Sequence, residues 1–378
     1  MKYALLILPS SNRVYADASI ALTRAEVELF GQAALGGRLG EVEQELIGGV
    51  PYVTFGVDGG LSGREVALLA NVSTAYALFA VEGKLLRPVE LSRLDRFDDD
   101  LITIQKYQGK TNEQFTKLLL NVTLLASQFG GEVLDRKLAV LDPLCGRGTT
   151  LNQALMYGWD AAGLDVDLKD FEAYAAFIQT WLKRKRIKHQ AQIGPVRRDR
   201  RIVARRLTIT LAAEKDDYKA GVTQQLDVVN ADTKAAGEFF RPESFHLVVA
   251  DAPYGVRHGS HSSGVGRGSS PSASTSGVGR GSSPSASTAA GLARSPLDLL
   301  RSAVPGWARL LKPGGALGIS WNTFVARRES AAAVLADAGL EVMDYGPYLR
   351  LAHRVDQAIN RDILVARKVA NPNQTLRS

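Results

Sequence analysis

The sequence predicts an α/β protein in which a mostly parallel sheet, covered by helices on both faces, follows a small α+β unit. Two observations lead to this class. From about residue 137 onward, apolar runs of strand length alternate with stretches of helical periodicity, which is typical of a parallel sheet. Before that point the order is strand, helix, strand, strand, helix, strand. The 378 residues, 45% of them hydrophobic, are sufficient for two packed domains.

The first domain, residues 1–95, is expected to be a ferredoxin-like α+β unit. Four runs have the length and composition of strands: 3–8, 41–47, 50–57 and 84–91. One helix is expected over 17–35 with Asp17 as its cap, and a second from a cap at Ser62 to about residue 80. Gly48 and Gly49 separate the two middle strands, which is a hairpin signal.

Residues 96–130 are expected to be a linker and a helix, 112–129, that lead into a second domain, 131–370. Strands of that domain are expected at 137–142, 160–165, 226–230, 245–250 and 315–321. Its helices are expected at 149–157, 168–182, 296–311 and 328–338. Two extended runs around Asp356, within 341–367, are expected to end the sheet as an antiparallel pair. Parallel strands with right-handed crossovers bring their carboxyl ends, and any ligand, to one edge of the sheet.

Residues 183–206 form a basic insert in the second domain. They hold eleven Lys and Arg and one acid, a net charge of +10, whereas the whole chain carries +7, so the remainder sums to −3. A basic patch on an otherwise slightly acidic protein is expected where phosphate backbones are contacted. The predicted contacts are Lys183, Arg184, Lys185, Arg186, Lys188, Arg197 and Arg198. The alternative is a solvated helix end followed by a basic hairpin.

A second insert, residues 259–290, is rich in Gly and Ser, and the sequence SGVGRGSSPSAST at 263–275 recurs unchanged at 276–288. Such a segment buries too little apolar surface to offset its ordering entropy, so we expect a disordered loop enlarged by tandem duplication. The alternative is a flexible arm that touches nucleic acid through Arg267 and Arg280.

The segment LDPLCGRGTT at 141–150 is expected to be a cofactor loop between a strand and a helix. Gly146 and Gly148 let the backbone pass close to a ligand, and the helix that starts at Thr149 presents free N–H groups to an anion. Asp142 at the mouth of the loop would repel a phosphate but attract the ammonium group of a bound amino acid. This charge favours S-adenosylmethionine (SAM) over a dinucleotide.

Acids at two further strand ends extend the expected cofactor site. Asp165 follows the glycines by about 20 positions, where an acid accepts both ribose hydroxyls, and Asp167 is the alternative unless it caps the next helix. Asp232 is expected to hydrogen-bond the adenine amino group. Cys145 is expected to contact the cofactor as a small residue of the loop, because no nearby His or Lys is evident to activate a thiolate.

The segment DAPYG at 251–255 is expected to be the reaction loop. Exocyclic amines of nucleobases are poor nucleophiles because their lone pair is delocalised into the ring. Hydrogen bonds accepted from both N–H groups, by the Asp251 side chain and the Ala252 carbonyl, would help the nitrogen pyramidalise. Pro253 would fix the chain direction and Tyr254 would stack on the target base. Arg257 would contact a phosphate or form a salt bridge.

On these motifs the second half of the chain, roughly 105–367, resembles the tRNA guanine-N2 methyltransferases and the related UPF0020 domain of ribosomal RNA guanine-N2 methyltransferases. The resemblance places Asp142, Gly146 and Gly148 on the family's cofactor loop, Asp165 on its ribose-binding acid, and Asp251, Pro253 and Tyr254 on its D-P-P-Y loop. Ala252 stands where that loop has its first proline. KTNEQFT at 110–116 resembles the segment that packs on the methionine end of the donor, which suggests donor contacts for Thr111 and Phe115. The implied fold is the class I methyltransferase sheet.

The expected function is therefore SAM-dependent methylation of an exocyclic nucleobase amine in RNA, most readily N2 of guanosine in tRNA, with no metal. One alternative is a DNA adenine-N6 methyltransferase, which shares both loops, and another is a non-catalytic RNA-binding protein that keeps the fold. With one cysteine, the chain can form neither an internal disulfide nor a Cys-based zinc site. No window approaches the roughly 18 apolar residues of a membrane span. A cytoplasmic protein is expected.

Overall fold

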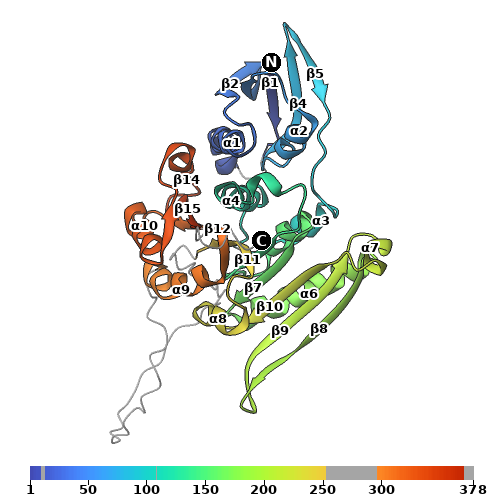
Figure 1. Ribbon diagram of the computed structural model, residues 1–378, viewed down its shortest axis with the longest axis vertical. Coiled ribbons are helices and arrows are strands. Elements are labelled where there is room, and N and C mark those ends of the chain that lie inside the picture. The colour runs from blue at the N-terminus through green and yellow to red at the C-terminus, as the bar shows by residue number, and fades with distance from the viewer. Residues whose placement is uncertain (10–12, 108, 253–295, 370–378) are drawn as a thin grey trace, which may run out of the picture.

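The structure is a computed structural model that describes residues 1–9, 13–107, 109–252 and 296–369. Within these ranges the chain forms two sheets, with one helix, α4, lying between them (Figure 1). Four of the predicted features lie outside the described residues: Pro253, Tyr254, Arg257 and the repeat insert 259–290.

The N-terminal unit is a five-stranded antiparallel sheet in the order β2-β3-β1-β4-β5 (Figure 1). Its elements are β1 (Lys2–Ile7), α1 (Arg13–Ala34), β2 (Leu39–Ile47), β3 (Val50–Val57), α2 (Gly63–Leu69), β4 (Ala75–Glu82) and β5 (Leu85–Val89). The order of the first four strands is that of the predicted ferredoxin-like unit. The strand predicted at 84–91 is β5 at the edge of this sheet, whereas β4 was not predicted as a strand.

Two local predictions in this unit are wrong. Helix α2 begins as expected, with Ser62 and Glu65 forming a capping box, but it ends at Leu69 rather than near residue 80. The following residues form β4 instead, because its buried positions alternate and it pairs along β1. Asp17 caps nothing, since α1 starts four residues earlier at Arg13 and buries Tyr15 in the core.

The second sheet has ten strands in the order β13-β15-β12-β11-β6-β7-β10-β9-β8, with β14 paired to β15. The strands are β6 (Ala139–Asp142), β7 (Asp160–Asp165), β8 (Lys188–Arg198), β9 (Arg201–Ala212), β10 (Gln224–Asn230), β11 (Phe245–Asp251), β12 (Leu311–Asn322), β13 (Leu340–Val342), β14 (His353–Arg354) and β15 (Asn360–Lys368). The five strands from β12 to β10 are parallel. Strand β15 is antiparallel to β12, β13 and β14, which confirms that antiparallel strands end the sheet. The run predicted before Asp356 is strand only at Leu340–Val342 and His353–Arg354.

Helices cover both faces of this sheet, and successive residues of its central strands point to opposite sides. In β11, Val249 belongs to the core under α4, α5 and α6, whereas Val248 belongs to the core under α8, α9 and α10. The helices of this half are α3 (Asp100–Thr103), α4 (Glu113–Ala126), η1 (Gly130–Glu132), α5 (Thr149–Met156), α6 (Leu168–Arg184), α7 (Lys215–Lys219), η2 (Thr233–Ala235), α8 (Ala236–Phe239), α9 (Pro296–Leu310), α10 (Arg328–Asp337) and η3 (Gly346–Arg350). Among the described residues, no helix is both long and apolar enough to cross a membrane.

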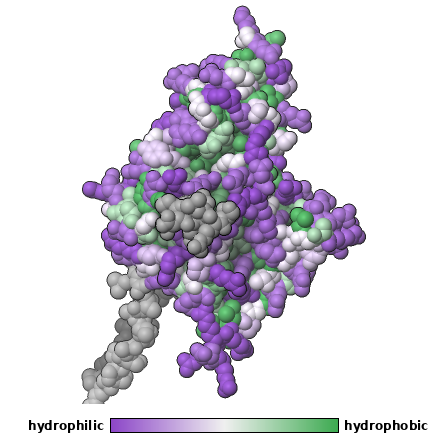
Figure 2. Space-filling view, in the orientation of Figure 1, coloured by the Kyte–Doolittle hydropathy of each residue, from purple (hydrophilic) through white to green (hydrophobic). Residues whose placement is uncertain are grey.

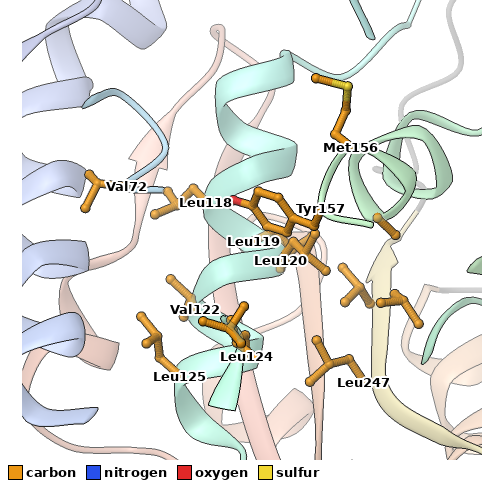
Figure 3. Packing of buried hydrophobic residues seen from close by; sticks show 14 of the residues in the cluster. Val72, Leu118, Leu119, Leu120, Val122, Leu124, Leu125, Met156, Tyr157 and Leu247 are labelled. Carbon is orange, nitrogen blue, oxygen red and sulfur yellow. The ribbon is translucent and has the colours of Figure 1, made fainter. Parts of the chain in front are cut away.

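Helix α4 is buried on nearly all sides, with only Lys117 exposed to any extent between Phe115 and Ala126. Its leucines face Val72 of the N-terminal unit on one side and Met156, Tyr157 and Leu247 on the other (Figure 3). Close approach to the sheet depends on Gly318 of β12, because a Cβ there would lie 1.8 Å from the Thr123 hydroxyl. A helix with this all-round burial belongs to both halves of the molecule.

Polar groups are also buried between α4 and the N-terminal unit. Glu26 is fully buried and accepts hydrogen bonds from the Ser73 backbone and hydroxyl and from the Asn121 amide, 2.7 Å away. The Asn121 carbonyl oxygen accepts a 2.9 Å hydrogen bond from the Tyr157 hydroxyl. Burial raises the pKa of Glu26. This network fixes α1 on α4, since a misplaced α4 would leave a buried carboxyl without donors.

Candidate active site

The carboxyl ends of β6, β7, β10 and β11 meet at one edge of the large sheet, as parallel strands require. A cavity of about 350 Å³ opens there between the predicted cofactor loop and the end of β11. It is lined by Tyr107, Gly109, Thr111, Phe115, Thr116, Leu119, Asp142, Leu144, Cys145, Gly146, Arg147, Thr149, Thr150, Asp170, Asp251 and Ala252. The two predicted loops, about a hundred residues apart in the chain, therefore share one cavity.

The cofactor loop turns through two glycines in left-handed backbone conformations, with φ of +47° at Gly146 and +79° at Gly148. At Gly148 space is restricted as well, because a Cβ would lie 2.3 Å from the Tyr174 ring. At Gly146 a Cβ would meet nothing within 4 Å, so only the backbone conformation favours glycine there. The loop leads directly into α5, whose first two residues, Thr149 and Thr150, line the cavity.

Asp142 is buried at the end of β6 and lines the cavity. Its carboxylate accepts a 3.0 Å hydrogen bond from the Leu144 backbone N–H, and the Thr150 side chain is a second partner. Burial raises the pKa of Asp142 to about 7, and the negative charges of Asp251 and Asp165 add to that rise. A cation placed beside Asp142 would relieve both effects, so the site favours a positively charged group.

Asp165 ends β7 and holds the loop from behind rather than lining the cavity. Its two oxygens accept hydrogen bonds from the Gly146 N–H at 2.7 Å and the Asp167 N–H at 2.8 Å. A carboxylate has further lone pairs, so Asp165 can still accept ribose hydroxyls. Asp167 is exposed and caps α6 through the Lys169 N–H, which is the helix-cap role that the sequence left open.

Asp232 is exposed, caps η2 through the Lys234 N–H, and does not line the cavity. The structure therefore does not bring this residue to the rest of the predicted cofactor site, and the adenine contact stays a prediction. Cys145 lines the cavity with a buried thiol whose pKa burial raises well above its ordinary value. A protonated thiol is no nucleophile, in agreement with the structural role expected of it.

Asp251 ends β11 with hydrogen bonds to both carboxylate oxygens. The Thr111 hydroxyl donates to one oxygen at 2.5 Å, and the Ser320 hydroxyl of the neighbouring β12 donates to the other at 2.8 Å. Ala252 is buried, and its N–H donates to the Ser320 carbonyl at 2.9 Å, which continues the strand pairing by one residue. These contacts fix the carboxylate at the cavity wall. Thr111, predicted to contact the donor, thus contacts the reaction loop.

Phe115 is fully buried and lines the cavity from α4, with the Arg361 guanidinium 4.2 Å from its ring centre and the His353 ring at 5.2 Å. These two residues come from β15 and β14, so the C-terminal strands support the wall of the cavity. Burial, together with the Arg361 charge, lowers the pKa of His353 to about 4 and keeps it neutral.

Sequence reasoning missed the group that lies over the cofactor loop. The Arg147 guanidinium stacks 4.8 Å from the Tyr107 ring centre and donates to Asp170 at 2.8 Å, while the Tyr107 hydroxyl lies 3.2 Å from the Thr149 hydroxyl. All four residues line the cavity, and of these only Thr149 was predicted to bind the cofactor. Tyr107 could have been found from its position, because it lies three residues before the 110–116 segment. Arg147 could have been found in the same way, because it lies between the two glycines of the cofactor loop.

The predicted nucleic-acid contacts are divided between opposite edges of the sheet. Five of them lie at the edge away from the cavity, where Lys188 pairs with Ala212. Lys183 and Arg184 form the last turn of α6, and Lys185, Arg186 and Lys188 follow it. There Lys185 forms ion pairs with Asp98 and Asp100. Arg197 and Arg198 lie at the other end of β8, on the cavity side, and Arg198 pairs with Glu238. The basic segment, which is continuous in the sequence, therefore contributes to two separate surfaces of the structure.

The residues present fit SAM. The cavity places a buried carboxyl for the donor's ammonium group beside helix N–H groups for its carboxylate, and Asp165 stands behind the glycine loop for the ribose. When bound, SAM supplies an electrophilic methyl group on a sulfonium. Together with the parallel order β12-β11-β6-β7-β10 and the reversed β15, this site defines a class I SAM-dependent methyltransferase domain.

Comparison with protein families agrees with this class. Residues 133–265, about a third of the chain, match the model of the UPF0020 family, described as an RMKL-like methyltransferase domain. The matched segment includes the cofactor loop and the end of β11. No curated protein sequence matches the chain significantly.

Solved structures with similar arrangements include methyltransferases. A TehB-like SAM-dependent methyltransferase from Corynebacterium glutamicum is 15% identical with a TM-score of 0.31, covering 64% of this chain and 86% of that one. An rRNA methylase from Streptococcus thermophilus is 11% identical with a TM-score of 0.32, covering 70% of this chain and 99% of that one.

Proposed function

We propose that the protein methylates an exocyclic amino group of a nucleobase in RNA, and that the target is N2 of guanosine, most readily in tRNA. The observation that carries this proposal is the Asp251 carboxylate, which lines the same cavity as Asp142 and the glycine loop. A carboxylate beside a methyl donor suits an acceptor that carries hydrogens to donate, which an amine does. The match to an RMKL-like domain supports RNA as the carrier of that amine.

The hydrogen bonds to Asp251 hold its carboxylate in a fixed position. Thr111 and Ser320 each donate to a different carboxylate oxygen, and a carboxylate can accept about four hydrogen bonds. An amine N–H donated to this carboxylate, with the second N–H donated to the Ala252 carbonyl, would reduce the delocalisation of the nitrogen lone pair into the ring. Fixed acceptors of this kind contribute through positioning, without reorganising during the reaction.

The test is methyl transfer from tritiated SAM to total RNA and, separately, to duplex DNA, followed by mass spectrometry of the modified nucleosides. We expect N2-methylguanosine in the RNA. N6-methyladenosine confined to DNA would replace the proposal with the DNA adenine alternative. Binding of S-adenosylhomocysteine and RNA with no modified nucleoside would indicate a non-catalytic RNA-binding protein.

The Asp251→Ala variant tests the assigned residue. We expect transfer to fall by at least roughly a hundredfold, the range seen when one preorganised polar group is removed from an active site. Affinity for S-adenosylhomocysteine, measured by calorimetry, should stay within a few-fold. The matched control is Asp216→Ala, which removes an exposed aspartate on α7 and should change neither quantity. A large loss of cofactor affinity in Asp251→Ala would show that Asp251 holds the donor instead.

A further inference from the structure

The β8–β9 hairpin projects past the edge of the sheet on which the cavity opens. Strand β9 pairs antiparallel with β10, and Arg205 lies opposite Asn230, the last residue of β10. Four more residues of β9, back to Arg201, extend beyond that point before the turn. At about 3.4 Å per residue, the tip stands roughly 14 Å beyond the carboxyl ends of the parallel strands. We call residues 197–201 at this end the hairpin tip.

The tip lies within reach of one nucleic acid that also enters the cavity. Strand β9 is four positions from β11 in the sheet order, through β6, β7 and β10. Four spacings of about 4.8 Å give roughly 19 Å sideways, so Asp251 and the tip are roughly 24 Å apart. In Figure 1 the tip extends from the lower end of the second sheet, and in Figure 2 hydrophilic side chains gather over it.

Four of the five residues of the tip are arginines, and three of these can contact a ligand. Within the described ranges, Arg197, Arg200 and Arg201 are exposed and form no ion pair. Arg198 instead pairs with Glu238, donates to the Glu238 carbonyl at 2.5 Å, and stacks 5.2 Å from the Phe239 ring centre. It anchors the tip to α8, and the other three arginines stand exposed at the end of the anchored hairpin.

The turn at the tip has an unfavourable backbone conformation for its residues. Arg198 pairs with Arg201, so Asp199 and Arg200 form a two-residue turn with φ of +46° and +64°. Such turns favour Asn-Gly or Asp-Gly, and an L side chain in this conformation costs about 1 kcal/mol or more. An arginine therefore occupies the position where glycine would be better. Backbone strain of this kind is concentrated at functional sites.

We infer that the hairpin tip binds the phosphate backbone of the RNA whose base enters the cavity, an inference that rests on the proposed function. Arg197, Arg200 and Arg201 supply the contacts. Strands β8 and β9 carry no Phe, Tyr or Trp, the usual platforms for unpaired bases, whereas exposed guanidinium groups match phosphate in charge and geometry. The contact is therefore to phosphates. The lysines and arginines at 183–188, at the opposite edge roughly 34 Å away along β8, belong to a different surface.

The experiment measures binding of a fluorescein-labelled 30-nucleotide RNA stem-loop by anisotropy over a range of KCl concentrations. The variant is Arg197→Gln/Arg200→Gln/Arg201→Gln, which keeps the Arg198 anchor. Loss of three phosphate contacts should weaken binding about ten- to a hundredfold at 0.1 M salt and flatten the slope of log K against log salt by about 2 to 3. The control, Lys84→Gln/Lys215→Gln/Lys219→Gln, removes the same charge from exposed positions away from the tip and should stay within twofold.

A second variant separates binding from folding. Arg200→Gly creates the favoured Asp-Gly turn, so its melting temperature should be unchanged or higher, while the salt slope falls by about 0.7 to 0.9, the share of one phosphate. Affinity for S-adenosylhomocysteine should match wild type in every variant.

Wild-type RNA affinity and slope in the triple variant, or an equal loss in the control, would overturn the inference even if the wild type methylates RNA. A wild type that neither binds nor methylates RNA would instead refute the proposed function.

Discussion

The ionisation of Asp142 sets how cofactor affinity should vary with pH. Its pKa is raised to about 7 by burial, so below neutral pH most of the free protein carries an uncharged Asp142. The donor's ammonium group should bind the charged form, which makes the ionised fraction the competent fraction: about 9% at pH 6 and about 67% at pH 7.3.

This titration predicts that cofactor affinity rises with pH up to neutrality. Affinity for S-adenosylhomocysteine should rise roughly sevenfold from pH 6 to pH 7.3. Calorimetry in buffers of different ionisation enthalpy should also detect proton release on binding at pH 6. In Asp142→Asn the rise should disappear and affinity should drop by about 1.5–3 kcal/mol, the value of a hydrogen bond to a charged group. An equal rise in the variant would refute the assigned pairing.

The same pKa shift has a consequence for stability. A carboxyl whose folded pKa lies above its unfolded value of 3.8 favours the fold fully below pH 3.8, and that contribution is lost as pH rises toward 7. Without cofactor, Asp142→Asn should therefore exceed wild type in free energy of unfolding at pH 8, on the order of 2–4 kcal/mol. The difference should vanish near pH 4.

Two further predictions concern packing and buried polarity. Gly148→Ala should lower the free energy of unfolding by at least about 2 kcal/mol and abolish cofactor binding, because its Cβ would clash with Tyr174, whereas Gly146→Ala should cost only about 1 kcal/mol for its backbone conformation. Urea unfolding compares them, and equal losses would contradict the packing explanation. Asn121→Ala should cost about 2–4 kcal/mol, since Glu26 and Tyr157 each lose a partner; a loss below about 0.5 kcal/mol would mean that water replaces the amide.

The sequence was sufficient for the two sheets and for the edge where the loops meet, because both follow from alternation and from strand ends that carry acids. Prediction from the sequence failed where contacts between distant segments determine the secondary structure. Residues 75–82 have helical composition and became β4 only because β1 lies beside them. The cap assigned to Asp17 failed because burial of Tyr15 extends α1 past the local signal.

Within the site, the sequence identified residues by chemical type but not by partner. Thr111 was associated with the donor, yet its hydroxyl bonds Asp251, a contact between residues 140 positions apart that no local pattern encodes. The basic run at 183–206 reads as one feature along the chain. A hairpin of two long strands separates its halves, since each residue of a strand adds about 3.4 Å between them.

The position of α4 also bears on how the chain can be divided. A cut near residue 95 follows the change in sequence character. It would separate the N-terminal unit from α4, the helix that covers α1, and it would expose the apolar side of α4 to water on the catalytic half. The carboxyl of Glu26 would lose its amide donor at the same time. Separate expression of either piece should therefore give an insoluble product, because the part of the chain that folds together is longer than the large sheet and its helices.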